Sequence, residues 1–155
     1  AFPATLELAT VGIVIGTLFG VPVGVWAAVR QGKLVDQVVR ILGLVGYSAP
    51  IFWLGLLGLL LFYAKWGMVA GPGRIDISYE YAFTPKTGLF LLDTAMQGQW
   101  DAFRNVVSHI ALPAALLGYY SMAYIARMTR SFMLNELAQE YAAGHRHRAV
   151  LRQPA

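Results

Sequence analysis

The chain has 155 residues, of which 57% are hydrophobic and only 13% are charged, with a net charge of +4. Soluble domains carry about 25% charged residues, so this composition excludes an ordinary soluble domain. The absence of cysteine excludes a disulfide framework and a thiolate metal site.

Three stretches of the chain contain no charged residue: 8–29, 41–64 and 110–126. A helix that spans a bilayer needs about 20 apolar residues, and a chain of this length cannot build a soluble shell around three such segments. We therefore expect an all-α integral membrane protein. Its three transmembrane helices should cover about 6–29, 41–64 and 109–130, with a long loop over about 65–108.

The basic residues are concentrated at two places along the chain. Eight of the 12 lie between the first two expected helices or after the third: Arg30, Lys33, Arg40, Arg127, Arg130, Arg146, Arg148 and Arg152. Because basic residues in short loops favour the cytoplasmic side, we expect the 30–40 loop and the tail to face the cytoplasm. The long loop, whose charges balance, should be extracytoplasmic. The basic residues of the tail lie beside membrane helices, so membrane topology explains their charge and nucleic-acid binding is not needed to account for it.

The first expected helix carries a glycine at every fourth position: Gly12, Gly16, Gly20 and Gly24. This spacing lines one face with bare backbone and lets a second helix approach closely, although glycine is frequent in membrane helices in any case. We predict that these glycines pack against another helix. We expect Glu7, near the start of the helix, at the outer interface rather than buried.

The sequence GYSAPIFWLG places Pro50 inside the second expected helix. Proline removes a backbone donor and kinks a helix, and Ser48 is available to satisfy the carbonyl that this leaves free. The bend is either a tolerated irregularity or part of a solute path. For the second alternative we name Ser48, Pro50 and, from the third helix, Tyr120 as candidate pathway residues.

A helical pattern also runs from Leu89 to Ser108, and the third helix should continue past the membrane as an amphipathic segment. In that segment Glu136 and Glu140 form a like-charged pair four residues apart, which is mildly unfavourable on an isolated helix. Either the two carboxylates lie on a solvated face, or a basic group outside the segment offsets their repulsion.

Motifs that carry enzymatic chemistry are missing from the sequence. There is no Gly-x-x-x-x-Gly-Lys-Ser/Thr loop, no Gly-x-Ser-x-Gly elbow and no His-Glu-x-x-His. The apolar runs lack the ionisable pairs that intramembrane catalysis needs, and His109 has no second metal-type residue at a suitable spacing. We therefore expect no enzyme, no metal site and no cofactor bound by this chain.

Four stretches carry a family resemblance: TLELATVGIVIGTLFGVPVGVWAAVRQGKLVD, GYSAPIFWLGLLGLLLFY, SHIALPAALLGYYSMAYIARMTRSFMLNEL and QEY. In this order, and over about residues 4–141, the chain resembles the membrane-spanning permease subunit of bacterial ABC importers for dipeptides and oligopeptides, a group that includes nickel and glutathione systems. The loop sequences GPGR and TGLFLLDTAMQGQWDAFRN resemble its peptide-type members. The sequence does not name the transported solute.

The resemblance implies a fragment of a six-helix subunit, holding the second to fourth helices. Such a subunit lies in the bacterial cytoplasmic (inner) membrane and binds no ATP itself. It forms the pathway with a sister permease, receives solute from an extracytoplasmic binding protein and is driven by separate ATPase subunits. Force arrives through a short cytoplasmic coupling helix, so the resemblance assigns Glu140 and Tyr141 to the ATPase contact. It leaves open whether Glu136 belongs to that contact or to a solvated face.

The tail over 142–155, AAGHRHRAVLRQPA, departs from the family pattern, which has a glycine where this chain has Ala149. Its composition is that of a GC-rich gene read in a shifted frame, so one hypothesis is a frameshift or deletion after about Tyr141. The alternative is a small helical membrane scaffold whose genuine basic tail binds lipid. Because the opening AFPATLELAT has neither Met nor a basic region, we expect a piece of a longer protein rather than a signal peptide.

Overall fold

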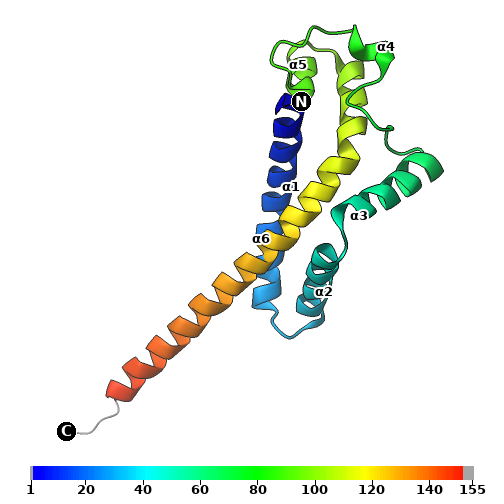
Figure 1. Ribbon diagram of the computed structural model, residues 1–155. Helices are drawn as coiled ribbons and strands as arrows, with labels where there is room; N and C mark the ends of the chain where they lie inside the picture. The colour runs from blue at the N-terminus through cyan, green and yellow to red at the C-terminus, as the bar shows by residue number, and fades with distance from the viewer. Residues whose placement is uncertain (1, 152–155) are drawn as a thin grey trace.

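The computed structural model describes residues 2–151, and that part of the chain is helical with no strand. Its helices are α1 (Phe2–Val29), α2 (Leu34–Ser48), α3 (Ile51–Gly58), the π-helix η1 (Leu59–Lys65), α4 (Ile77–Glu80), α5 (Phe90–Met96) and α6 (Trp100–Leu151). Figure 1 shows α1 beside α6, with α2 and α3 along one side and α4 and α5 at the end where α1 begins. The expectation of an all-α fold is confirmed for the described residues.

Length and composition give two helices that can cross a bilayer, α1 and the Trp100–Arg146 part of α6. The third candidate consists of two helical segments, Leu34–Ser48 and Ile51–Lys65. Together they are long and apolar enough to cross a bilayer, but they are bent by 99° relative to each other. The described chain therefore holds two candidate spans, or three if the bent pair is one span. The sequence predicted a single kinked helix over 41–64, and the bend is far larger than such a kink.

The break in the second span follows from the chemistry of Pro50. Proline has no backbone N–H to continue the helix, and it forces the preceding residue out of the helical region. Ala49 accordingly ends α2 in an extended conformation (ψ 128°), and Pro50 is extended as well (ψ 133°) before α3 begins. The chain changes direction across these two residues, which we call the helix break.

Other helix bounds also differ from the predicted ones. α1 begins at Phe2 rather than near residue 6, and α6 runs without interruption from Trp100 to Leu151, well outside 109–130. The helical pattern expected from Leu89 to Ser108 is divided, since Gly98 adopts a positive φ of 68° between α5 and α6. Such a φ is accessible to glycine and ends a helix.

The core of the structure is the contact between α1 and α6, which run in the same direction (Figure 1). The four glycines of α1 are buried, and we call them the glycine seam: Gly12, Gly16, Gly20 and Gly24. A Cβ added to Gly12 would lie 2.8 Å from Leu117 Cβ, and one added to Gly24 would lie 2.6 Å from the Ala126 carbonyl oxygen. Only glycine therefore lets the two backbones approach this closely.

The partners of the seam recur every four residues along α6. Gly16 faces Ser121 and Gly20 faces Ile125, so the register between the helices is constant along the contact. The contact is reciprocal, because a Cβ on Gly118 of α6 would lie 2.6 Å from Ile15 Cγ2 on α1. The glycine spacing in the sequence thus predicted a packing face, and the structure identifies α6 as the helix packed against it.

Replacing Gly16 with leucine should destabilise the protein by about 3 kcal/mol, because the new side chain would overlap Ser121 in a closely packed contact. The measurement is unfolding of the purified chain in detergent, followed by circular dichroism. Gly43→Ala is the matched control: nothing lies within 4 Å of its added Cβ, and alanine in mid-helix should stabilise by less than about 1 kcal/mol. Equal stability of the two variants would contradict the seam.

Candidate functional site

At the helix break backbone carbonyls lose their helical partners, and Tyr120 of α6 supplies a replacement for one of them. The Tyr120 hydroxyl donates a hydrogen bond to the Ala49 carbonyl at 2.6 Å, and the Tyr119 hydroxyl donates to the Leu42 carbonyl. In an apolar environment an unpaired carbonyl is costly, so the Tyr120 bond stabilises an otherwise unfavourable interruption. The Tyr119 bond reaches a carbonyl inside α2 and joins that helix to α6. The sequence suggested Ser48 for this role; the bond to the carbonyl at the break comes from Tyr120.

The candidate pathway residues are brought together at this break. Ser48 ends α2, Pro50 precedes α3, and Tyr120 contacts Ala49 between them. Ser48 and Pro50 are exposed, whereas Tyr120 is half-buried. The arrangement combines a discontinuous helix with polar groups, which is how many membrane transporters build solute sites.

A buried ion pair ties the α1–α2 turn to α6. Arg130 donates from Nε to Asp36 Oδ1 at 2.6 Å and from Nη2 to Oδ2 at 2.9 Å, and the Gly32 N–H donates to the same carboxylate at 3.0 Å. Asp36 is only 1% exposed. We call Gly32, Asp36 and Arg130 the clamp. Its two parallel charge-assisted bonds fix the orientation of α2 against α6 more strictly than a single contact could.

At the opposite end of α1, the long loop folds over the start of the helix and buries Glu7. This carboxylate accepts hydrogen bonds from the Leu91 N–H at 2.6 Å and from Arg74 Nη2 at 3.3 Å. Arg74 also donates to the Gly88 carbonyl and lies 3.8 Å from the centre of the Phe90 ring. The expectation that Glu7 would not be buried is therefore wrong, because the loop supplies the partners that a buried carboxylate needs.

Asp93 organises the loop that covers this end. Its carboxylate accepts hydrogen bonds from the backbone N–H groups of Lys86, Thr87 and Gly88 and from the Thr87 hydroxyl, at 2.8 to 3.2 Å. Burial opposes ionisation of this group, but the hydrogen bonds to Thr87, Gly88 and Lys86 outweigh it and hold the pKa of Asp93 below its ordinary value. The loop is therefore an ordered cap rather than a loose connector.

The coupling candidates lie at the other extremity of the molecule. Residues 131–151 of α6 extend past Arg130, and Figure 1 shows this part projecting beyond the other helices. Glu136, Glu140 and Tyr141 are all exposed on it, and the Tyr141 ring lies 5.2 Å from the His145 ring. A surface hollow here is bordered by Leu137, Glu140, Tyr141, Gly144, His145 and Arg148. The two glutamates thus have a solvated position in the described structure.

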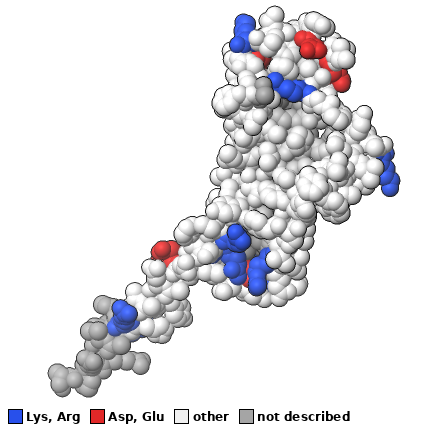
Figure 2. Space-filling view, viewed as in Figure 1, with Lys and Arg blue, Asp and Glu red and all other residues white. Residues whose placement is uncertain are grey.

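The two ends of the molecule differ in charge. Figure 2 shows basic side chains gathered around the α1–α2 turn and the adjoining stretch of α6, and basic and acidic side chains together at the end near α4 and α5. Among the described residues, no group of three or more His, Cys, Asp or Glu is placed to hold a metal ion. His109 instead contacts the Asn105 carbonyl through Nδ1 and lies 3.4 Å from Asp76.

Sequence reasoning missed the clamp, Tyr119 and the Asp93 cap. Asp36 had a usable signal, since it is the one acidic residue among the basic residues between the first two helices. Asp93 follows a TPKTG turn, where a carboxylate can bind freed N–H groups. The partner Arg130, 94 positions from Asp36, had no signal in one sequence.

Comparison with known proteins identifies the family. Residues 20–150 match the family described as the binding-protein-dependent transport system inner membrane component, and the chain belongs to this family. The members of this family are described as inner membrane components of a transport system.

Several relatives are named as peptide permeases. The chain is 44% identical to the di/tripeptide transport system permease protein DppB of Pseudomonas aeruginosa over 90% of its length and 41% of that protein. It is 40% identical to the dipeptide transport system permease protein DppB of Escherichia coli K12, over 97% and 45% of the two chains. For the peptide transport system permease protein SapB of Salmonella typhimurium the identity is 30%. The chain spans less than half the length of these relatives.

The tail is described only in part. α6 continues through residues 142–151. The family match reaches residue 150, whereas the motifs that carry the resemblance in the sequence end at Tyr141. Residues 152–155, including Arg152, lie outside the described residues. The frameshift interpretation of 142–155 stays a prediction.

Removing one member of the clamp should cost more than removing both. Asp36→Ala leaves a partly buried guanidinium without its carboxylate, and we expect a loss of about 3 kcal/mol. A double-mutant cycle with Arg130→Ala, measured by unfolding in detergent, should give a coupling energy of at least about 1 kcal/mol. Asp101→Ala, at an exposed position on α6, is the control and should change stability by less than about 0.5 kcal/mol. Additive effects at Asp36 and Arg130 would exclude the clamp.

The Asp93 cap should weaken in acid. The pKa of Asp93 is lower in the folded protein than in the unfolded chain. The stabilisation by its carboxylate is therefore fully present above the pKa of the unfolded state, about 3.9, and is lost as the pH falls through the pKa of the folded state. Amide exchange at Lys86–Gly88, corrected for the intrinsic rate, should therefore accelerate below about pH 4. In Asp93→Asn the amide carbonyl does not titrate, so protection should be lower and nearly independent of pH. A wild-type profile that is flat to pH 3 would refute this.

Proposed function

We propose that the chain is part of the permease subunit of an ATP-driven peptide importer. The observation that carries the proposal is the family match over residues 20–150, joined to identities of 39–44% with proteins named as dipeptide or di/tripeptide permeases. The chain contributes membrane helices to a translocation pathway, and ATP is bound and hydrolysed by separate ATPase subunits.

The helix break is our candidate for a pathway surface in this chain. Transporter sites are commonly formed by discontinuous helices near the membrane midplane, where bent backbone is kept satisfied by neighbouring helices. Ser48, Pro50 and Tyr120 meet at such a break, and the Tyr120–Ala49 bond keeps the backbone satisfied there. A bend at this position can change its angle when force is applied to the helices that carry it.

The projecting part of α6 is our candidate for the ATPase contact. At 1.5 Å per residue, residues 131–151 extend roughly 30 Å beyond the clamp. Their exposed Glu136, Glu140 and Tyr141 have no role in the packing of the described chain. A basic patch on the ATPase would both recognise the two glutamates and relieve their mutual repulsion.

The proposed mechanism is alternating access with no covalent step in this chain. ATP binding brings the ATPase subunits together, and the movement passes through α6 to the clamp and the helix break. The pathway is shared with a sister permease, and an extracytoplasmic binding protein delivers the solute. The long loop, capped through Glu7 and Asp93, lies at the end that would face the binding protein.

The test is Glu140→Lys in a full-length permease subunit that carries this segment. The wild-type subunit should co-purify with an ATPase, and the variant should lose transport-coupled ATP hydrolysis by at least about tenfold, because a lysine would face the proposed basic patch. Glu80→Lys is the control: it makes the same change at an exposed position at the opposite end of the molecule, away from the proposed ATPase contact, and should retain co-purification with the ATPase and ATP hydrolysis in the absence of the binding protein. Unchanged ATPase activity and uptake in Glu140→Lys would overturn the coupling role.

A further inference from the structure

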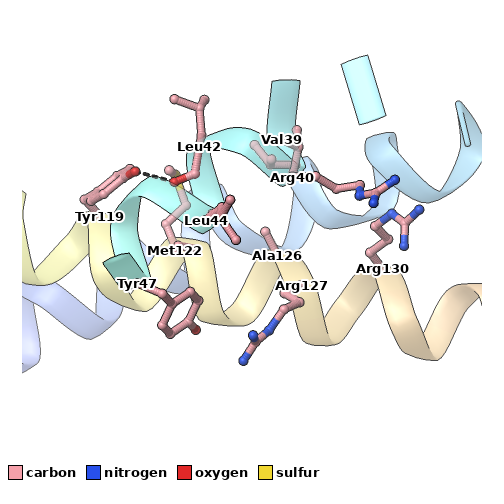
Figure 3. Close-up of a pocket in the computed structure, with 13 residues that line it drawn as sticks. Val39, Arg40, Leu42, Leu44, Tyr47, Tyr119, Met122, Ala126, Arg127 and Arg130 are labelled. Carbon is pink, nitrogen blue, oxygen red and sulfur yellow. Dashed lines mark hydrogen bonds between the residues drawn. The ribbon is translucent and has the colours of Figure 1, made fainter. Parts of the chain in front are cut away.

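A cavity of about 360 Å³ lies between α2 and α6, beside the clamp (Figure 3). Most of its lining is apolar and includes Val23, Val39, Leu44, Met122 and Ala126. Its volume is within the range of pockets that hold small ligands, roughly 300 to 1,000 Å³. Nothing in the proposed transport function assigns a ligand to it.

Three arginines also line this cavity: Arg40, Arg127 and Arg130. Figure 3 shows the Arg40 and Arg130 guanidinium groups pointing toward the same space, while Arg127 lies against Tyr47, at 4.5 Å from the ring centre. Asp36 neutralises one positive charge through its bidentate bond to Arg130. Two positive charges beside an apolar cavity are therefore left without a matching carboxylate among the described residues.

The position of the arginines along the chain fixes their depth. Arg40 directly precedes the uncharged stretch 41–64, and Arg127 directly follows the uncharged stretch 110–126. We therefore expect the guanidinium groups at the boundary of the apolar layer and the apolar lining on its hydrocarbon side. The surrounding excess of basic residues indicates the cytoplasmic boundary.

We propose that this cavity binds one anionic phospholipid of the cytoplasmic leaflet. The phosphate is held by Arg40 where it faces Arg130, Arg127 adds positive charge at the same boundary, and an acyl chain occupies the apolar part between α2 and α6. Guanidinium groups bind phosphate through charge-assisted hydrogen bonds, and basic pockets between transmembrane helices are recurrent sites for anionic headgroups. A soluble anion would leave the apolar part empty, and a zwitterionic lipid would leave the charge unmatched.

The headgroup is tested on the purified chain in detergent, mixed with equal amounts of phosphatidylglycerol and phosphatidylcholine. Native mass spectrometry counts the lipid molecules retained. A charge-assisted hydrogen bond to phosphate is worth roughly tenfold or more in affinity, so Arg40→Gln/Arg127→Gln should lose at least about fivefold of the phosphatidylglycerol preference. Arg30→Gln is the matched control, because Arg30 lies on the same side of the membrane but does not line the cavity.

The acyl chain is tested with Gly43→Leu. Gly43 lines the cavity and nothing lies within 4 Å of its added Cβ, so leucine can fill the space without clashing and leaves all three arginines in place. Retention of phosphatidylglycerol should fall several-fold, whereas Gly144→Leu, at an open position on the projecting part of α6, should retain it. Circular dichroism and the unfolding midpoint confirm that each variant is folded.

Other occupants give different results. If a helix from the remainder of a full-length subunit fills the cavity, the full-length protein will retain no more phosphatidylglycerol than phosphatidylcholine. If a second copy of the chain occupies it, Gly43→Cys will form a disulfide between copies in the membrane. Either result, or an unchanged lipid preference in Arg40→Gln/Arg127→Gln or in Gly43→Leu, would overturn the lipid proposal.

Discussion

The structure depends on the close approach of α1 and α6. Lipid tails are as apolar as leucine, so the hydrophobic effect gives two membrane helices little reason to associate, and packing between backbones must supply the attraction. The glycine seam meets this requirement with four backbone positions in constant register against α6. Once α1 is fixed on α6, the turn after α1 brings Asp36 to Arg130, and the loop before α6 lies over Glu7.

The rest of the structure satisfies polar groups that this packing leaves in apolar surroundings. The Ala49 carbonyl at the helix break bonds to Tyr120, and the buried carboxylates of Asp36 and Asp93 accept hydrogen bonds from arginine, hydroxyl or backbone N–H donors. No buried side-chain nitrogen or oxygen in the described part of the chain lacks a partner. The bonds of Tyr120 and Arg130 join residues 71 and 94 positions apart, and they also determine how the bent second span lies against α6.

This arrangement gives α6 a special position in the proposed mechanism. One uninterrupted helix contacts the glycine seam, the helix break and the clamp, and then projects toward the side where the basic residues gather. A displacement applied at Glu140 would therefore be transmitted along a rigid element to Tyr120 at the break. The cavity between α2 and α6 lies beside this route, so the proposed lipid would occupy the space into which α2 could otherwise move.

The sequence by itself determined the class of protein. Uncharged stretches, basic residues beside them and a glycine at every fourth position are local patterns, and hydrophobicity and backbone sterics act on them wherever they occur. The sequence also located the irregularity at Pro50, because the missing N–H is a property of that residue. What the tertiary structure decided is which groups meet: α6 against the seam, Tyr120 at Ala49, Arg130 at Asp36 and the loop over Glu7. The hydrogen bonds among these pairings join residues 71 to 94 positions apart, and Gly12, Gly16 and Gly20 of the seam meet residues 105 positions further along. These pairings depend on the register of packed helices, which the periodicity of one segment does not contain.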